Sequence, residues 1–211
     1  IMDFPSAWAQ TADEYLDKGL ALFEQYRQHP LTSTALGPHA PYTVADEALR
    51  KIQKAADTHN IDIHMHVNET AHEVTEALRQ NGQRPMERLH ALGLLSPRFQ
   101  AVHMTQITDI EIKLLAQSGA HVIHCPESNL KLASGLCPIN RLQQAGINVA
   151  LGTDGAASNN DLDMISELRT ASLIAKLADQ DATALPAYEA LKLATLNGAK
   201  ALRLEQEIGS L

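Results

Sequence analysis

The sequence has little of what marks several large classes of protein. Only two of its 211 residues are cysteines, Cys125 and Cys137, which favours a reducing compartment over a disulfide scaffold, although this pair could still form one bridge. No apolar run approaches the roughly 20 residues that span a bilayer, and no basic and apolar signal sequence opens the chain. The net charge of -8 argues against nucleic acid as the main partner, because phosphates are bound by basic surfaces. We therefore expect a cytoplasmic protein that binds neither nucleic acid nor a membrane.

What is present is an ordinary globular composition. Hydrophobic residues make up 45% of the chain and charged residues 20%, which is enough for a substantial core. No linker, low-complexity segment or block of charge divides the sequence. Residues 1–211 are therefore expected to form a single domain.

Short β-rich runs alternate with runs of helical periodicity. Because strands that alternate with helices form βαβ units, the pattern predicts a parallel sheet. The predicted strands lie within 31–43, 61–67, 99–105, 121–126 and 147–154, and the predicted helices within 43–60, 71–82, 108–119, 138–146, 161–178 and 186–204. Residues 3–28 are expected to be mainly loop and amphipathic helix.

A titratable residue lies at the carboxyl end of each predicted strand. These residues are His39, His66, His103, His124 and Asp154, each about one strand–helix unit from the next. In a (β/α) barrel this end of the strands forms the active-site face. A doubly wound open sheet also binds ligands there, but it usually has a glycine-rich phosphate loop, and no G-x-G-x-x-G occurs in this chain. We therefore favour an α/β fold of the (β/α)8 TIM type.

Imidazole and carboxylate groups gathered at one mouth suit a borderline divalent metal such as zinc. His66 and Asp154 are the strongest candidate ligands. Glu69 follows His66 by three residues and is placed to act as a general acid or base. His103 either binds the metal or stabilises a hydroxide bound to it. His64 alternates onto the same strand face as His66, and we expect it to lie one layer deeper with a structural role.

Each of these residues also has a simpler interpretation. A single histidine is as often a hydrogen-bonded structural residue as a ligand, and the Asp154–Gly155 pair is a common turn signal. The functional interpretation rests on the whole set occurring at successive strand ends.

Five segments together resemble the amidohydrolase superfamily, in particular its branch of 5-methylthioadenosine/S-adenosylhomocysteine deaminases and related chlorohydrolases. They are "GPHAPYT", "MHVNET", "AVHMT", "HCPESNLKLASG" and "LGTDGAASNND", and the resemblance extends over essentially the whole chain. It implies a metal-dependent aminohydrolase that releases ammonia from a 6-aminopurine nucleoside such as 5′-methylthioadenosine or S-adenosylhomocysteine.

The resemblance also implies roles for individual residues. His66 and Asp154 would bind one metal ion per subunit, usually Zn2+, with Fe2+ as the alternative. Asp154 would accept the proton of the metal-bound water, Glu69 would transfer protons to the purine ring, and His103 would steady the hydroxide. The residues implied to contact the substrate are His39, Glu69, Ser128, Asn129 and Asp154.

The sequence departs from the family pattern at both ends. Family members carry an H-x-H pair of metal ligands on the first barrel strand, and their chain continues into a small β-sandwich. His64-Met65-His66 mimics that pair, but a complete strand–helix unit that supplies His39 precedes it and Glu69 follows it, so neither the first-strand pair nor the β-sandwich is found within residues 1–211. We therefore expect a catalytic barrel domain that is incomplete, as a piece of a longer chain, and that has little activity alone. A homodimer is the default expectation for the assembly.

Two alternatives remain open from the sequence. The first is a deaminase or chlorohydrolase of another heterocycle, such as guanine, cytosine, a triazine or a pterin. The second is a metal-free binding relic, against which the retained carboxylates of Glu69 and Asp154 argue, because buried carboxylates without a function are costly.

Overall fold

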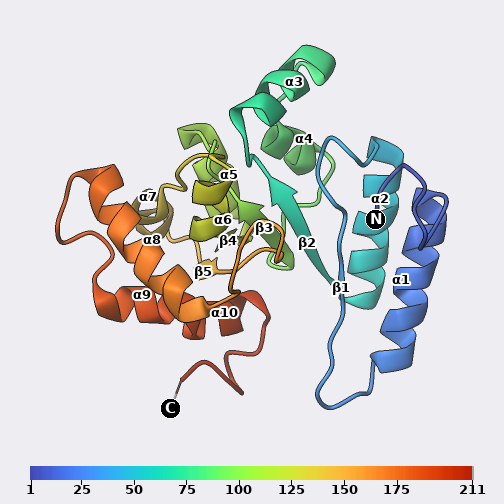
Figure 1. The fold of residues 1–211 in the computed structure, drawn as a ribbon. Helices are drawn as coiled ribbons and strands as arrows, with labels where there is room; N and C mark the ends of the chain where they lie inside the picture. The colour runs from blue at the N-terminus through green and yellow to red at the C-terminus, as the bar shows by residue number, and fades with distance from the viewer. Residues whose placement is uncertain (211) are drawn as a thin grey trace.

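The computed structural model describes residues 1–210, in which one parallel sheet is surrounded by helices (Figure 1). The sheet has five strands in the order β1-β2-β3-β4-β5, which is their order in the sequence. Every neighbouring pair is parallel, so all five carboxyl ends lie along one edge. The strands are β1 (Ala35–Leu36), β2 (Asp62–Val67), β3 (Phe99–His103), β4 (His121–His124) and β5 (Val149–Leu151).

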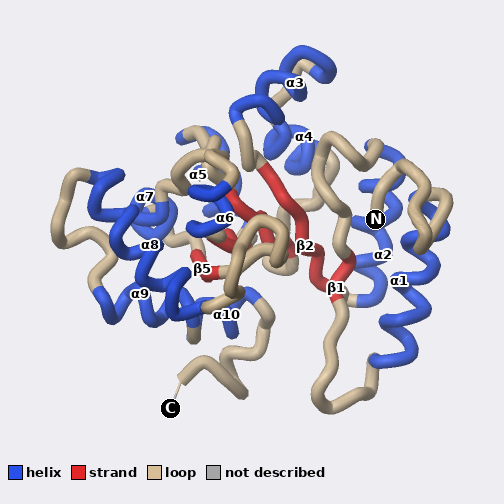
Figure 2. Tube along the Cα trace, in the orientation of Figure 1, coloured by secondary structure: helices blue, strands red, loops and turns tan. Residues whose placement is uncertain are grey.

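One helix precedes the first strand, and the others lie between the strands or follow the last one (Figure 2). They are α1 (Ala12–Tyr26), α2 (Asp46–His59), α3 (Ala71–Asn81), α4 (Pro85–Ala91), α5 (Asp109–Ser118), α6 (Pro126–Lys131), α7 (Ile139–Gln144), α8 (Met164–Asp179), α9 (Ala187–Ala194) and α10 (Leu196–Ala201). The helices α1 and α2 lie beside β1 at one end of the sheet, and α8 to α10 lie beyond β5 at the other (Figure 1).

Local sequence signals define the bounds of helix α5 as predicted. The Thr108 hydroxyl accepts the N–H of Glu111, and the Glu111 carboxylate accepts the N–H of Thr108, so both groups are satisfied in a capping box. The helix ends at Gly119, whose φ of 74° is a left-handed conformation that glycine adopts without a steric penalty.

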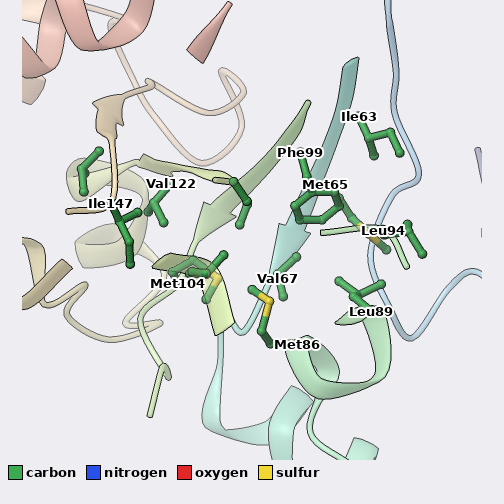
Figure 3. Close-up of a cluster of buried hydrophobic side chains, with 14 of the residues drawn as sticks. Ile63, Met65, Val67, Met86, Leu89, Leu94, Phe99, Met104, Val122 and Ile147 are labelled. Atoms are coloured by element: carbon green, nitrogen blue, oxygen red, sulfur yellow. The ribbon is translucent and has the colours of Figure 1, made fainter. Parts of the chain in front are cut away.

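The two faces of the sheet differ in the residues they carry. On β2, Ile63, Met65 and Val67 are buried in the main core, whereas the alternate positions carry His64 and His66. Figure 3 shows the apolar side chains of β2 and β3 packed against Met86 and Leu89 of α4. The opposite face of the sheet carries a smaller apolar cluster of Val102, Ile123, Cys125, Ala150 and Ala201.

Packing in the main core stabilises the strands whose ends carry the predicted site residues. Phe99 is fully buried at the start of β3, next to Met65 and Leu94 in Figure 3. Removing a buried aromatic ring leaves a cavity and costs about 3–5 kcal/mol. The single change Phe99→Ala is therefore expected to destabilise the sheet severely.

The structure differs from the sequence prediction in three elements. The helix predicted within 186–204 is two helices, because the backbone at Thr195 leaves the helical region with φ -128° and ψ -93°. The short helices α4 and α6 were not predicted, and each begins with proline at a position where its missing N–H costs nothing.

Among residues 1–210, no helix combines the length and the apolarity that a membrane crossing requires.

Candidate active site

Three predicted residues meet at the carboxyl edge of the sheet. His66 lies in β2, His103 is the last residue of β3, and Asp154 follows β5 by three residues. One potential ligand atom from each side chain lies within 4.8 Å of the other two. Residues distant in the sequence are thus brought together because parallel strands end at the same edge.

The ring of His66 is held by a backbone carbonyl. Its Nδ1–H donates to the carbonyl oxygen of His39 over 2.6 Å. This hydrogen bond fixes the tautomer in which Nε2 carries a free lone pair. The other nitrogen of His66 is therefore prepared to bind a metal.

The ring of His103 reaches the site through a break in the strand pattern. Register pairs His103 with Val67, and strict alternation would put its side chain on the helix-covered face. Positive φ angles at His103 (76°) and Met104 (53°) break the alternation, and the ring stacks on that of His66 with centroids 5.4 Å apart.

The side-chain amide of Asn129 anchors the His103 ring. Its Nδ1–H donates to Oδ1 of Asn129 over 2.8 Å, which leaves the Nε2 lone pair directed into the site. The ring is only 1% exposed, and this burial lowers the pKa of His103 below its ordinary value. His103 is therefore a neutral imidazole at neutral pH.

Asp154 is held by three donors. The hydroxyls of Ser128 and Ser158 each donate to its Oδ2 over 2.6 Å, and the N–H of Gly155 donates to Oδ1 over 2.8 Å. Burial raises the pKa of Asp154, but the three hydrogen bonds outweigh it and the net pKa is lowered. Asp154 is thus an ionised carboxylate in a left-handed backbone conformation, with φ of 62°.

Glu69 lies beside the two histidines, on the turn between β2 and α3. Its Oε2 lies 3.8 Å from Nε2 of His103, and its Oε1 accepts the Ser134 hydroxyl over 3.0 Å. The buried carboxylate of Glu73 accepts the backbone N–H groups of Asn68 and Glu69 and fixes the turn. Glu69 also forms part of the wall of a cavity of about 450 Å³ between this turn, α3 and α4.

The other predicted site residues lie around this group. Ser128 and Asn129 of α6 are buried and contact Asp154 and His103 respectively. The side chain of His39 is exposed, with its Nδ1 3.0 Å from the Thr43 hydroxyl and its ring 5.3 Å from that of His66. His64 is remote from the metal group, and its Nδ1 lies 2.6 Å from Oε1 of Gln100, as expected for a structural histidine.

His124 does not join the site, although it also ends a strand. Its backbone pairs with Leu151, and both residues follow the alternation onto the helix-covered face, with Val122. It is buried, neither ring nitrogen has a hydrogen-bond partner within residues 1–210, and burial lowers its pKa to about 3. The adjacent Cys125 is a buried free thiol, as is Cys137.

Three residues with evident parts in the site were not found by sequence reasoning. Ser158 binds Asp154, Ser134 binds Glu69, and Glu73 fixes the turn that carries Glu69. Ser158 follows Asp154 by four residues, so its proximity to a predicted ligand was the one available signal. The other two contacts depend on tertiary structure.

The donor set fits a borderline divalent cation. Two imidazoles and a carboxylate are the ligand types that zinc prefers, and second hydrogen bonds orient all three side chains. A model of the amidohydrolase family matches residues 6–211. The chain belongs to the amidohydrolase family.

Individual relatives agree with this assignment. A 5-methylthioadenosine/S-adenosylhomocysteine deaminase of Teredinibacter turnerae is 55% identical over all 211 residues, which cover 48% of that protein. A zinc-bound crystal structure of an adenosine deaminase from Xanthomonas campestris superposes with a TM-score of 0.97 at 54% identity, covering 100% of this chain and 48% of the other. A zinc complex of atrazine chlorohydrolase from Arthrobacter aurescens superposes with a TM-score of 0.90 at 27% identity, covering 98% of this chain and 46% of the other.

This amidohydrolase chain spans about half the length of the curated relatives it matches. Its five strands and their helices form part of the TIM-type barrel of metal-dependent hydrolases, as predicted. The predicted family is confirmed, and a metal cofactor is supported by the zinc-bound structures and by the His66–His103–Asp154 group.

Proposed function

We propose that this chain carries the metal-binding and proton-transfer residues of a hydrolytic deaminase. Its substrate would be a 6-aminopurine nucleoside such as 5′-methylthioadenosine or S-adenosylhomocysteine. The observation that carries the proposal is the approach of His66, His103 and Asp154 to within 4.8 Å, with Glu69 beside them. The name of the Teredinibacter turnerae relative supports the choice of substrate.

Nε2 of His66 and a carboxylate oxygen of Asp154 would hold one ion per chain, which we propose to be Zn2+, with Fe2+ as the alternative. When bound, the ion acts as a Lewis acid and supplies a water nucleophile at neutral pH. Nε2 of His103 faces the same space, where it accepts a hydrogen bond from the attacking water.

The two acidic residues divide the proton transfers. Asp154, with its lowered pKa, is ionised and accepts the proton that the water loses. Glu69 delivers a proton to the ring nitrogen next to the amino-bearing carbon, so that the ring accepts the electron pair of the new C–O bond. Asp154 then passes its proton to the amino group, the hydroxyl proton returns to Glu69, and the C–N bond breaks. The amino group leaves as ammonia, the product carries a carbonyl at that carbon, and both carboxyl groups regain their starting protonation states.

The residues around this pair supply contacts of two kinds. We propose that His39, whose ring is exposed at the mouth, contacts the substrate. Ser128 and Asn129, which were predicted as substrate contacts, are bonded to Asp154 and His103, and this favours an orienting role for both. The substrate contacts of Glu69 and Asp154 follow from their proton transfers.

The alternative is a hydrolase of another ring or leaving group on the same scaffold. Atrazine chlorohydrolase and an Escherichia coli guanine deaminase share the fold with TM-scores of 0.90 and 0.87. Their identities of 27% and 26% are about half of the 55% with the methylthioadenosine deaminase. This difference favours the purine nucleoside.

The test is ammonia release from 5′-methylthioadenosine and from S-adenosylhomocysteine, measured on the 211-residue polypeptide and on a polypeptide of the full length of the curated relatives. We expect little release from the former, because two ligands are fewer than the three protein ligands of a typical catalytic zinc site. We expect ready release from the latter and none from its Asp154→Asn variant. A panel of guanine, cytosine and a chlorotriazine separates the alternatives, and no release of ammonia from either nucleoside would reject the proposal.

We further propose that the protein works in the cytoplasm as a homo-oligomer. Two buried free thiols support a reducing compartment, and closed two-fold dimers are the commonest assembly of soluble enzymes. Light scattering on the ammonia-releasing polypeptide would measure its mass, and a monomer would contradict the assembly.

A further inference from the structure

The hydroxyl of Ser134 engages one of the two oxygens of Glu69. It donates to Oε1 over 3.0 Å, while Oε2 faces Nε2 of His103 at 3.8 Å. Ser134 is only 5% exposed, so water does not compete freely for this contact. The last torsion of a glutamate side chain is broad and nearly two-fold, and a fixed donor on one oxygen selects one orientation of the carboxylate.

The segment that carries Ser134 is fastened to the turn that carries Glu69. The Ser134 carbonyl accepts the side-chain N–H of Gln106 over 2.9 Å, and its N–H donates to the carbonyl of Asn129 over 2.9 Å. The Thr105 hydroxyl lies 3.2 Å from the Ser134 carbonyl and 2.5 Å from the Glu69 carbonyl. Serine and glutamate are thus held by the same residue, and their separation is fixed by backbone as well as side-chain contacts.

The backbone on either side of Ser134 is unusual. Ala133 has a φ of 53° and Gly135 a φ of 136°. A side chain at Gly135 would meet Nε2 of Gln106 at 2.6 Å and Oγ1 of Thr105 at 2.9 Å. Such conformations persist only where surrounding contacts enforce them, and they cluster at functional sites.

We propose that Ser134 is a positioning residue, which holds the carboxylate of Glu69 with one oxygen free to transfer a proton to the substrate ring. The inference rests on the proposed deaminase function. Ser134 binds the oxygen of Glu69 that does not face His103, so its hydroxyl acts through Glu69 and not on the substrate. The orientation of the Glu69 carboxylate affects the rate of proton transfer more than it affects the affinity for the substrate. Loss of the hydroxyl therefore lowers kcat and leaves KM unchanged.

The experiment compares Ser134→Ala, Ser134→Thr and the control Ser172→Ala in the polypeptide that releases ammonia. Ser172 donates its hydroxyl to the Leu185 carbonyl, remote from Glu69. We expect Ser134→Ala to lower kcat about 10- to 100-fold, as for the loss of a hydrogen bond to a charged group. KM and the metal content stay within about two-fold of the parent. Ser134→Thr, which keeps the hydroxyl, is expected to recover most of kcat, and Ser172→Ala to retain all of it.

Several results would overturn the inference. They are an unchanged kcat in Ser134→Ala, a rise in KM that accounts for the whole loss, a loss of bound metal, or a failure of this variant to fold. In that order, these results would show that the Ser134 hydroxyl has no role, that it serves substrate binding, that it serves the metal site, or that it serves the stability of the fold. Failure of the parent polypeptide to release ammonia would instead reject the proposed function, so the two failures are distinct.

Discussion

At the scale of single residues, the site is built from side chains whose second hydrogen bonds are already made. His66 donates to a carbonyl, His103 to an amide oxygen, and Asp154 accepts three donors. The left-handed backbone at His103 and Asp154 costs on the order of 1–3 kcal/mol each. The backbone at these two residues is thus locally strained, and this conformation directs both side chains toward a common point.

Removal of the Ser128 hydroxyl tests whether this orientation matters. Ser128→Ala deletes one donor to Oδ2 of Asp154, and partners of metal ligands are typically worth about 10- to 100-fold in metal affinity. We expect a weakening of this size in a competition titration with a chromophoric zinc chelator, with the same Ser172→Ala variant unchanged. A raised KM with unaltered zinc affinity would instead assign Ser128 to the substrate.

The residues of the candidate metal site could be found from the sequence, because His66, His103 and Asp154 each lie at or just beyond the end of a recognisable apolar strand. Ser128 and Asn129 were also found, but as substrate contacts, and their bonds to Asp154 and His103 depend on tertiary structure. The same reasoning included His124, which the strand alternation turns toward the helices. His103 avoids that outcome only through positive φ angles at His103 and Met104, which are uncommon at any residue other than glycine and so could not be expected from the sequence.

At the scale of elements, the segment 133–135 is a constrained connection near the site, with positive φ angles at Ala133 and Gly135. Gly135→Ala introduces a side chain at a φ of 136° and against Thr105 and Gln106. We expect a loss of about 1–3 kcal/mol in the free energy of unfolding, measured in urea. The matched change Gly198→Ala lies in α10, where a methyl group meets nothing within 4 Å. It should be neutral or stabilising by up to about 1 kcal/mol, and equal losses in both variants would contradict the account.

Glu167 of α8 links the two segments that carry Ser128 and Asp154. It accepts the backbone N–H of Glu127 and the side-chain amide of Asn159. Burial raises its pKa from 4.5 to about 7. Because the folded state binds this proton more tightly than the unfolded state, the resulting stability is fully present below pH 4.5 and is lost as the pH rises through about 7.

Glu167→Gln should remove this pH dependence. Between about pH 5 and pH 8, we expect the free energy of unfolding of the parent to fall relative to that of the variant, by at most about 3 kcal/mol. Urea titrations across that range measure it. Glu207→Gln, at an exposed position, serves as the control. A difference that stays constant with pH would show that Glu167 is ionised in both states.

Element bounds were predictable where a cap residue marks them. Thr108 and Gly119 enclose α5, and Gly82 ends α3, in agreement with the predicted ranges 108–119 and 71–82. Thr70, which caps α3, was not predicted. The break between α9 and α10 falls at Thr195, with no proline and no glycine there, so the periodicity continues across it. Asn197 follows this break and donates its side-chain amide to the carbonyl of Val149, so tertiary contacts determine the break.

At the scale of the molecule, β1 and β5 form the two edges of the described sheet. Each pairs on one side only within residues 1–210, and the face opposite the main core carries His64, which is exposed. Unpaired strand edges invite association with other chains. We expect the 211-residue polypeptide to scatter light with a mass above its 23.0 kDa and to associate further with concentration. A stable 23.0 kDa species at every concentration would contradict this.

We propose above that His66 and Asp154 share one metal ion. The most direct measurement is an anomalous difference map at the zinc edge, from crystals of the polypeptide that releases ammonia grown with zinc. We expect one peak about 2.0–2.2 Å from Nε2 of His66 and from a carboxylate oxygen of Asp154. A zinc ion bound by other residues, or the absence of a peak between these two side chains, would contradict the shared metal site.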